Sequence, residues 1–420
     1  MHLRHRQTCR VCKSPALTKV IDLGEQFLQG SFVKPDKRMP PLRKLPTSLV
    51  RCDPMRDEKA CGLLQMEYTV PPNILYSQYW YRSGTNRTMR DHLAGIVNSS
   101  LSLYGQTPGI VLDIGSNDGT LLSFYNKDIK KIGIDPSDIA SNAVIENGTV
   151  IRDLFPSQEL IAHLSGSKID IITAIAMFYD LESPADFVSG IRNVLADDGL
   201  FIFEMSYMPT MLKKCMYDTI CHEHLEYYSL AVVEHILRLD DMKIIRAELN
   251  DSNGGSIRCF ATHGRSFKYR SDIDGLHAIR EDEFNLALDT DRPYRNFQDR
   301  INIHREELNQ LLWSLKREGK KIHIYGASTK GNTIMQWCGI DNRVIDYAAE
   351  RNPEKFGART LGTDIPIISE DESRAMKPDF YLVLPWHFRT EILEREAETM
   401  RRGIQLIFPL PTIEIFGQSA

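Results

Sequence analysis

The chain has 420 residues, of which 42% are apolar and 25% are charged, and its formal net charge is -5. This length suggests roughly two to four globular domains, and the small acidic excess argues against a dedicated nucleic-acid-binding protein. We find neither a signal-peptide pattern nor an apolar run long enough for a membrane span, so we expect a cytoplasmic protein that does not attach to membranes. The eight cysteines are then expected to be buried or metal-bound rather than disulfide-linked.

Three regions with different residue patterns follow one another, and we predict a domain for each. Residues 1–75 are rich in Pro and Cys and show little helical periodicity. Residues 76–250 alternate between short apolar runs and helical stretches, and residues 251–420 return to this alternation after a turn-rich segment. Alternating strands and helices predict parallel sheets with right-handed crossovers, so the predicted fold class is α/β.

The predicted strands are short and apolar, as strands covered on both faces usually are. In the middle region they span 110–113, 131–135, 169–174 and 200–204. In the last region, 293–319 reads as a long helix with Pro near its start and Gly at its end. Strands predicted there at 321–326, 344–347, 380–384 and 405–408 indicate a second, smaller Rossmann-like sheet.

Four cysteines of the first region suit a zinc site. Cys9 and Cys12 form a C-x-x-C knuckle, and Cys52 and Cys61 follow about 40 residues later. Four thiolates would form a closed, tetrahedral and therefore structural site. A zinc ribbon normally repeats the two-residue gap, whereas an inserted polar loop separates Cys52 from Cys61. One knuckle with two unrelated cysteines is therefore the alternative.

A glycine-containing loop at 113–119, Asp-Ile-Gly-Ser-Asn-Asp-Gly, follows a predicted strand and opens a helix. Its glycines allow a tight turn and a close approach of the backbone to a ligand. About twenty residues later, an acid at the end of the next strand can accept hydrogen bonds from two ribose hydroxyls. The predicted cofactor-binding residues here are Asp113, Gly115, Asn117, Asp118, Gly119, Asp135 and Pro136.

The ligand of this loop could be a dinucleotide or S-adenosylmethionine, and a bare turn without a ligand is the third interpretation. A dinucleotide would need G-x-G-x-x-G, which seats a pyrophosphate on the helix N-terminus. Asp118 would repel a pyrophosphate but could meet the cationic amino acid end of S-adenosylmethionine, which we therefore favour. Asp153 would then lie where the adenine edge is read, and Ala174 and Met177 where the methyl donor faces a substrate.

The segment 219–228 is the most unusual one, because Cys221, His222, Glu223 and His224 follow one another. All four are potential metal ligands. On a helix, however, His222 and His224 would point about 200° apart and could not share an ion, whereas an extended segment would turn them the same way. We favour acid–base chemistry, with imidazole as the base. A metal site and a solvated polar surface remain the alternatives.

In its combination of motifs the chain resembles the nucleotide-sugar C-methyltransferases that act on 4-keto-6-deoxy sugars, notably the TDP-sugar C-3'-methyltransferases of antibiotic-sugar pathways. The resemblance covers essentially the whole length. No single motif is diagnostic, but their order and spacing are specific. Beyond the cysteine knuckle, the motifs lie at 22–24, 79–83, 115–119, 223–224, 253–256, 325–330, 338–340 and 385–387.

This resemblance implies an N-terminal zinc-binding domain, a class I (Rossmann-like) methyltransferase core that uses S-adenosylmethionine, and a C-terminal Rossmann-like domain that helps to bind a TDP- or GDP-linked keto-sugar. It implies that His224 removes the C3 proton next to the C4 ketone, with Glu223 beside it, in deoxysugar biosynthesis. No catalytic metal is then needed, and three self-contained domains allow a monomer. The expected substrate contacts are Tyr79, Tyr81, Ser83, Gly255, Ser328 and Lys330, although such tyrosines are commonly core residues.

The chain departs from this family beside the sugar. Cys221 stands where family members from antibiotic pathways typically carry Tyr, and Ala176 and Asp180 stand where they tend to carry Asn and His. We interpret the chain as a related subgroup with another sugar or nucleotide, in which Cys221 beside His222 could supply the donor lost with the Tyr.

The C-terminal glycine loop 326–331 also follows a strand and precedes a helix, as a dinucleotide site would. It lacks an acid at the end of a second strand in good register, because Asp346 comes only two residues after Val344. A contact to the phosphates of the sugar nucleotide is therefore our interpretation. The remaining alternatives for the whole chain are a small-molecule O-methyltransferase and a non-enzymatic zinc-binding interaction module.

Overall fold

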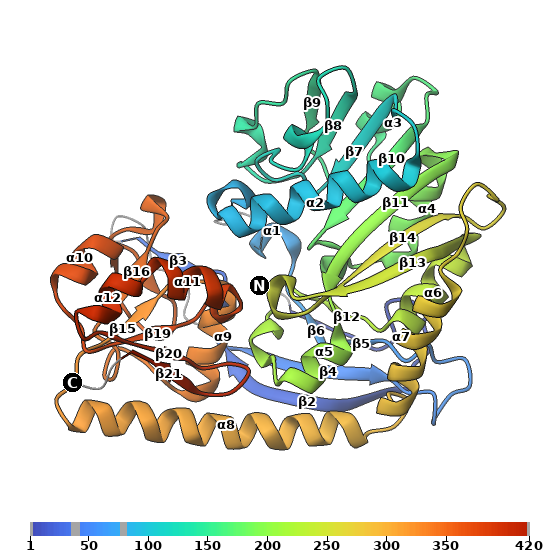
Figure 1. The fold of residues 1–420 in the computed structure, drawn as a ribbon. Coiled ribbons are helices and arrows are strands. Elements are labelled where there is room, and N and C mark those ends of the chain that lie inside the picture. Colours follow the sequence, from blue (N-terminus) through green and yellow to red (C-terminus); the bar gives the residue numbers. More distant parts are fainter. Residues whose placement is uncertain (1–2, 35–42, 76–81, 418–420) are drawn as a thin grey trace.

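The middle region of the chain forms a seven-stranded sheet, here called the central sheet (Figure 1). The computed structural model describes residues 3–34, 43–75 and 82–417. In spatial order the strands of the central sheet are β9 (Gly148–Ile151), β8 (Lys130–Ile134), β7 (Ile110–Ile114), β10 (Ile169–Ile175), β11 (Leu195–Ser206), β14 (Ser256–His263) and β13 (Met242–Asn250). The neighbours from β9 to β11 pair in parallel, whereas β14 is antiparallel to both β11 and β13.

The order of these strands identifies the fold. Numbered along the chain, they read 3-2-1-4-5-7-6, so the first five follow the order of the dinucleotide-binding fold. The antiparallel seventh strand lies between the fifth and the sixth, which is the arrangement of the class I methyltransferase core. The predicted α/β, Rossmann-like core is therefore confirmed. The sheet continues past residue 250, where the sequence pattern placed a domain boundary, because β14 belongs to it.

Helices cover both faces of the central sheet. One face packs against α2 (Arg87–Tyr104), and the other against α3 (Gln158–Leu164), α4 (Pro184–Val194) and α6 (Leu230–Leu239), with α7 (Ile273–Leu286) next to α6. Alternate strand residues serve the two faces: Val111 lies in the cluster with α2, and Leu112 lies in the opposite cluster. Double coverage explains the continuously apolar strands and leaves the strand ends as the accessible edge.

The N-terminal region forms a four-stranded antiparallel sheet in the order β12, β5, β4 and β2. Three strands are local, namely β2 (Leu17–Gln26), β4 (Leu45–Cys52) and β5 (Leu64–Met66). The fourth, β12 (Glu226–Tyr227), comes from the segment just after His224. Short pairs join β1 (Arg4–His5) to β6 (Tyr68–Thr69), and β3 (Phe32–Val33) to β17 (Arg359–Thr360). The short helices α1 (Pro72–Leu75) and α5 (Met208–Lys214) lie at the borders of this region.

The C-terminal region is a smaller Rossmann-like sheet, as predicted. Its order is β18 (Ile367–Ser369), β16 (Tyr347–Glu350), β15 (Ile322–Tyr325), β19 (Phe380–Val383), β20 (Gln405–Phe408) and β21 (Glu414–Phe416), and only β21 is antiparallel. Its helices are α9 (Thr329–Cys338), α10 (Glu370–Ala375), α11 (Arg389–Arg395) and α12 (Ala397–Arg401). The long helix α8 (Arg292–Arg317) runs beneath this sheet and along β2 (Figure 1). No helix in the described ranges combines the length and apolarity that a bilayer span requires.

One predicted strand is displaced. We predicted residues 344–347, whereas β16 spans Tyr347–Glu350. Val344 and Ile345 are fully buried, but they lie in a turn in which both backbone amides donate to the carbonyl of Asp341. The buried apolar residues of a turn thus gave the same sequence pattern as a strand. The shift matters because it places Glu350 at the end of the second strand.

Candidate active site

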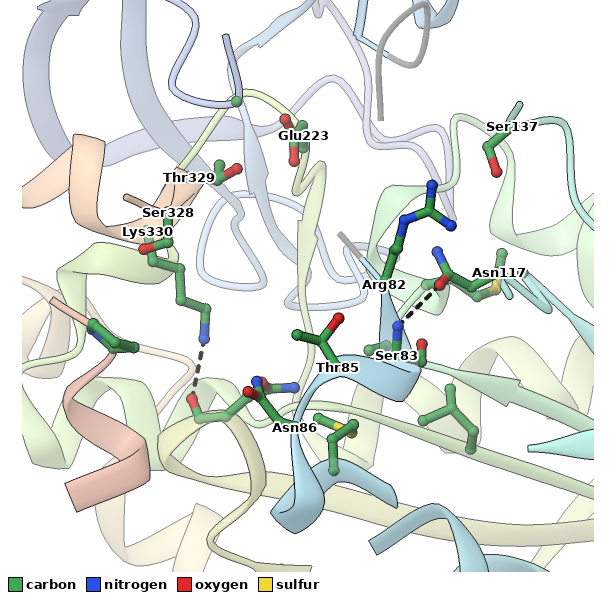
Figure 2. Close-up of a pocket in the computed structure, with 18 of the residues that line it drawn as sticks. Arg82, Ser83, Thr85, Asn86, Asn117, Ser137, Glu223, Ser328, Thr329 and Lys330 are labelled. Atoms are coloured by element: carbon green, nitrogen blue, oxygen red, sulfur yellow. Dashed lines mark hydrogen bonds between the residues drawn. The ribbon is translucent and has the colours of Figure 1, made fainter. Parts of the chain in front are cut away.

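A cavity of about 490 Å³ lies between the carboxyl ends of the central strands and those of the C-terminal sheet. Loops after β7, β8, β9 and β10 line it on one side, and the loop after β15 with the segments after β16 and β19 lines it on the other. Figure 2 shows Ser83 and Asn117 across the space from Ser328 and Lys330, with Glu223 at its upper end. Parallel α/β sheets bind ligands at this edge.

The loop after β7 holds the predicted cofactor side of the cavity. Gly115 has a φ of +74°, and a Cβ atom there would lie 3.2 Å from the side chain of Met177. Asp135 holds the loop in place. Its Oδ2 accepts a hydrogen bond from the backbone amide of Asn117, and its Oδ1 accepts one from the backbone amide of Ser137, both 2.8 Å long. Asp113 accepts a hydrogen bond from the Thr173 hydroxyl at 2.6 Å.

The residues of this side fit S-adenosylmethionine. The hydroxyls of Ser116 and Ser137 are buried at the cavity and have no hydrogen-bond partner among the described residues. Carboxyl groups of Asp113, Asp135 and Asp153 line the same wall, which suits a cationic cofactor and would repel a pyrophosphate. Burial and the charge of Asp135 raise the pKa of Asp113 to about 7.

Other predicted cofactor residues differ in their position. Pro136, Asp153 and Met177 line the cavity, whereas Asp118, Gly119 and Ala174 do not. Asp118 accepts hydrogen bonds from the Gly84 amide and from the Thr120 amide and hydroxyl, so it supports the 83–85 turn. Gly119 lies beside Ile145, and Ala174 is fully buried within β10. Asp118 therefore affects the cavity indirectly, by holding the 83–85 turn, whose residues Ser83 and Thr85 line it.

Replacing Asp135 by Ala should weaken binding of S-adenosylmethionine about 10- to 100-fold. Two amide donors lose a charged acceptor, and hydrogen bonds to charged groups are worth about 1.5–3 kcal/mol. Calorimetric titration with the cofactor measures the change. Asp138→Ala is the matched control, because that exposed carboxylate pairs with Arg152, just after β9, but does not line the cavity. Equal affinity of the Asp135 variant and the wild type would refute this role.

His224 lines the cavity and has a defined tautomer. Its Nδ1 lies 2.8 Å from the backbone carbonyl of Thr219, which can only accept, so Nδ1 carries the proton and Nε2 keeps its lone pair. The ring also packs against Tyr179, with ring centroids 4.4 Å apart and the ring planes inclined at 55°. Burial and the nearby charge of Lys330 lower the pKa of His224 to about 4. The imidazole is therefore neutral, and able to accept a proton, at ordinary pH.

Glu223 lies beside His224 and also lines the cavity. A side chain at position 30 would collide with the carboxyl group of Glu223, so Gly30 provides the space that this group occupies. Burial raises the pKa of Glu223 to about 7. Asp180, which the sequence comparison marked only as a departure, lines the same wall.

Cys221 and His222 do not line the cavity. His222 is buried against the N-terminal region, with Nδ1 2.7 Å from the Gln29 side chain and Nε2 3.3 Å from the Thr47 hydroxyl. Cys221 is fully buried, and burial raises the pKa of its thiol well above the ordinary value. The structure thus separates His224 and Glu223, which face the cavity, from the two residues before them.

The C-terminal wall brings Ser328 and Lys330 to the cavity, whereas Gly255 lies behind it against Thr210. Ser328 caps α9, since its hydroxyl accepts a hydrogen bond from the Gly331 amide at 3.0 Å. Lys330 donates to the backbone carbonyl of Asn253 at 3.1 Å, which links the C-terminal loop to the central domain (Figure 2).

The expectation that this loop lacks an acid at the end of a second strand was wrong. Glu350 ends β16 and lines the cavity. Its Oε1 accepts from the Arg351 and Asn352 amides, and its Oε2 lies 3.4 Å from the Lys355 ammonium. The strand had been predicted at 344–347 instead of Tyr347–Glu350, so Glu350 was not recognised as the acid at its end.

The predicted contacts Tyr79 and Tyr81 lie outside the described residues. Ser83, which follows them, lines the cavity, and its amide donates to the Asn117 side chain at 3.0 Å (Figure 2). Glu204, which the sequence analysis missed, also lines the cavity and belongs to a buried ion network. Glu204 of β11 pairs there with His92 at 2.5 Å and with Arg258 at 2.9 Å. No local sequence motif predicts this network, because its three residues come from the separate elements α2, β11 and β14.

The four cysteines of the N-terminal region converge as predicted. Their sulfur atoms all lie within 4.8 Å of one another. Cys9 and Cys61 are 3.6 Å apart, and Cys12 and Cys52 are 3.4 Å apart. Sulfurs around one tetrahedral zinc ion with bonds of about 2.3 Å would be about 3.8 Å apart, so the four thiols fit this metal. The inserted loop does not displace Cys61, which excludes the alternative of two unrelated cysteines.

Comparisons with known proteins agree with this architecture. Three family models match in chain order: "Putative zinc binding domain" at residues 9–76, "Methyltransferase domain" at 85–246 and "C-methyltransferase C-terminal domain" at 251–411. The chain is 27% identical over 411 residues to the C-methyltransferase NovU of Streptomyces niveus, and the match covers 96% of this chain and 95% of NovU.

Similar solved structures include two methyltransferases. The magnesium protoporphyrin IX methyltransferase of Synechocystis PCC 6803 is 15% identical, with 44% of this chain and 90% of that chain covered and a TM-score of 0.34. The N-methyltransferase NodS of Bradyrhizobium japonicum is 13% identical, with 43% and 98% covered and a TM-score of 0.33.

The strand order, the loop after β7 and the matched domains define an S-adenosylmethionine-dependent methyltransferase. The three matched models, in this order, and the similarity to NovU over nearly the whole length agree with an S-adenosylmethionine-dependent C-methyltransferase that carries a zinc-binding N-terminal domain. The non-enzymatic interpretation of the sequence is thereby excluded.

Proposed function

We propose that this protein methylates C3 of a nucleotide-linked 4-keto-6-deoxy sugar in deoxysugar biosynthesis, through an enolate that His224 generates. The observation that carries the proposal is the hydrogen bond from Nδ1 of His224 to the Thr219 carbonyl, because it leaves Nε2 as a base inside the cofactor cavity. Methylation of a carbon next to a ketone needs such a base, since the nucleophile, an enolate, must first be made by removing the α-proton.

The cofactor side of the cavity supplies the methyl group. Bound S-adenosylmethionine offers an electrophilic methyl on a sulfonium ion. Asp135 and the loop after β7 would hold the adenosine, and Asp113 would lie towards the cationic amino acid end. The contribution of the protein is to hold the nucleophilic carbon and the methyl group in line at contact distance, which can account for several kcal/mol of the barrier.

The C-terminal wall suits the nucleotide half of the substrate. The N-terminus of α9 and the Lys330 ammonium would bind the diphosphate, as helix N-termini commonly do. Glu350, at the end of β16, would accept a hydrogen bond from a hydroxyl of the pentose, as an acid does at this position in dinucleotide-binding folds. A bound diphosphate would also offset the charge of Lys330 and so raise the pKa of His224 towards its usual value, which strengthens the base.

A panel of TDP- and GDP-linked 4-keto-6-deoxy sugars, incubated with the full chain and S-adenosylmethionine, tests this function. We expect one compound to gain a methyl group by mass spectrometry, and NMR of the product to place that methyl on C3. The same compound should exchange its C3 proton with deuterated water when the cofactor is left out. A methyl on oxygen or on another carbon, or no product across the panel, would overturn the proposal.

A further inference from the structure

Asp180 lines the same cavity as the base His224. It ends the short turn η4 (Phe178–Asp180), which follows β10. The backbone amide of Leu225 donates to the Tyr179 carbonyl at 2.8 Å, and the Tyr179 ring packs at an angle against the His224 ring. The turn and the catalytic segment are thus held side by side, with Asp180 and His224 on one wall.

The Asp180 carboxyl group has no partner of opposite charge in the described part of the chain. Its Oδ1 is buried and accepts no hydrogen bond from any described residue. The charged groups that act on it are Glu223 and Glu226, both carboxyls. The cations that act on the neighbouring residues His224 and Glu226 are engaged elsewhere: the Arg10 Nε lies 3.5 Å from Glu226, and Lys330 donates to the Asn253 carbonyl. A buried carboxylate without a partner is costly, so this group is expected to keep its proton.

The surroundings also favour a proton on this group. Burial, together with the charges of Glu223 and Glu226, raises the pKa of Asp180 well above its ordinary value. A neutral carboxylic acid differs from a carboxylate in that it can donate a hydrogen bond. Ketosteroid isomerase, which also removes a proton next to a ketone, uses an aspartic acid kept neutral by an apolar site to hold the developing oxyanion.

We propose that Asp180, as a neutral carboxylic acid, donates a hydrogen bond to the ketone oxygen of the substrate and stabilises the enolate formed by His224. This inference rests on the proposed function. The α-proton passes to Nε2 of His224, the C–H electron pair becomes the enolate double bond, and the carbonyl π pair moves to the oxygen that Asp180 holds. When the α-carbon bonds to the methyl group, the carbonyl re-forms and S-adenosylhomocysteine leaves. Asp180 keeps its proton, and His224 returns its proton to solvent.

Asp180→Ala and Asp180→Asn separate the possible roles of the group. Loss of one oxyanion donor typically lowers the rate about 10²- to 10³-fold. We expect the Ala variant to lose this much in cofactor-free exchange of the α-proton and in methyl transfer, with unchanged affinity for S-adenosylmethionine. The Asn variant should recover part of the loss, because an amide N–H also donates. Asp186→Ala is the matched control, since that residue of α4 accepts a hydrogen bond from the Ser183 hydroxyl just before the helix and does not line the cavity.

The pH profile distinguishes a donor from a merely structural residue. The donor works while protonated, so wild-type exchange should fall as the pH rises through the pKa of Asp180. The Asn variant should lack this basic limb, because its amide does not titrate. Infrared difference spectra of the cofactor-free protein at pH 7 should also show a protonated-carboxyl band that Asp180→Asn removes.

Three results would overturn the inference. They are exchange by Asp180→Ala within about twofold of the wild type, an Asn variant as inactive as the Ala variant, and a missing carboxyl band. The second would instead indicate a carboxylate that binds a cationic group of the substrate. If the wild type exchanges the α-proton and any of these results appears, the proposed function stands and only the role of Asp180 falls. If the wild type acts on no keto-sugar, both fall.

Discussion

Replacing His224 by Ala is expected to lower α-proton exchange and methyl transfer about 10³- to 10⁴-fold, at the upper end for loss of a general base. The reason is geometric: the Thr219 carbonyl fixes the Nδ1 proton, so Nε2 is the basic atom that the ring offers to the cavity. Exchange into deuterated water without cofactor, followed by NMR, measures the proton step alone. Calorimetry should find cofactor affinity within about twofold of the wild type.

The neighbouring histidine provides the contrast. His222→Gln should lower the free energy of unfolding by about 1–3 kcal/mol, because Gln29 and Thr47 lose a buried partner. Its exchange rate per folded molecule should stay near that of the wild type. His277→Ala, on the exposed face of α7, should change neither quantity. Normal exchange by His224→Ala, or its loss in His222→Gln, would reverse the assignment of the base.

The pH dependence of the wild type follows from the same residue. His224 acts in its neutral form, so exchange should fall as the pH drops through its pKa. Burial and Lys330 lower that pKa to about 4, below the usual 6.5, so the acid limb of kcat/KM for exchange, which reports the enzyme before substrate binds, lies at unusually low pH. Lys330→Met removes one of the two causes, and it should move the acid limb upwards.

Removing zinc is expected to unfold the N-terminal region and to abolish activity. The four sulfurs join segments about 40 residues apart, and structural zinc sites contribute about 10–16 kcal/mol to folding in isolated zinc fingers. The sheet that these segments carry includes β12, which follows His224 directly. Cys12→Ser, or treatment with a strong chelator, should therefore lower the melting temperature and the exchange rate together.

Metal analysis and thermal unfolding check this expectation. The wild type should hold one zinc ion per chain, and Cys12→Ser should hold much less. Cys215→Ala is the control, because that cysteine is buried directly after α5 and is not part of the cluster. A zinc-free wild type with unchanged stability would show that the four thiols have another purpose.

Sequence reasoning found the elements whose pattern is local. The strands around 110, 131 and 169 are apolar on both faces, and the knuckle at Cys9 has a fixed spacing, so each could be recognised without the fold. The prediction failed where an apolar run could arise either from a strand or from a buried turn. Val344 and Ile345 look like a strand but are buried in a turn, and this error concealed Glu350.

Side-chain direction was the second limit. Asp118 was predicted to meet the cofactor, but its carboxylate turns to Gly84, which lies 34 positions earlier in the chain. The sequence places His222 and His224 two positions apart, and only the fold shows that one faces Gln29 and the other the cavity. Tertiary contacts decide such directions, and a single sequence does not record them.

The pairing of β12 with β5 has a consequence for synthesis of the chain. Residues 64–66 leave the ribosome long before their partners at 226 and 227, so the zinc-binding region cannot complete its sheet until the core has been almost entirely made. Until then β5 is an unprotected sheet edge, and such edges pair readily with other chains. Nascent chains stalled before residue 226 should therefore aggregate even when zinc is bound, so a fragment that ends there would be a poor substitute for the whole protein.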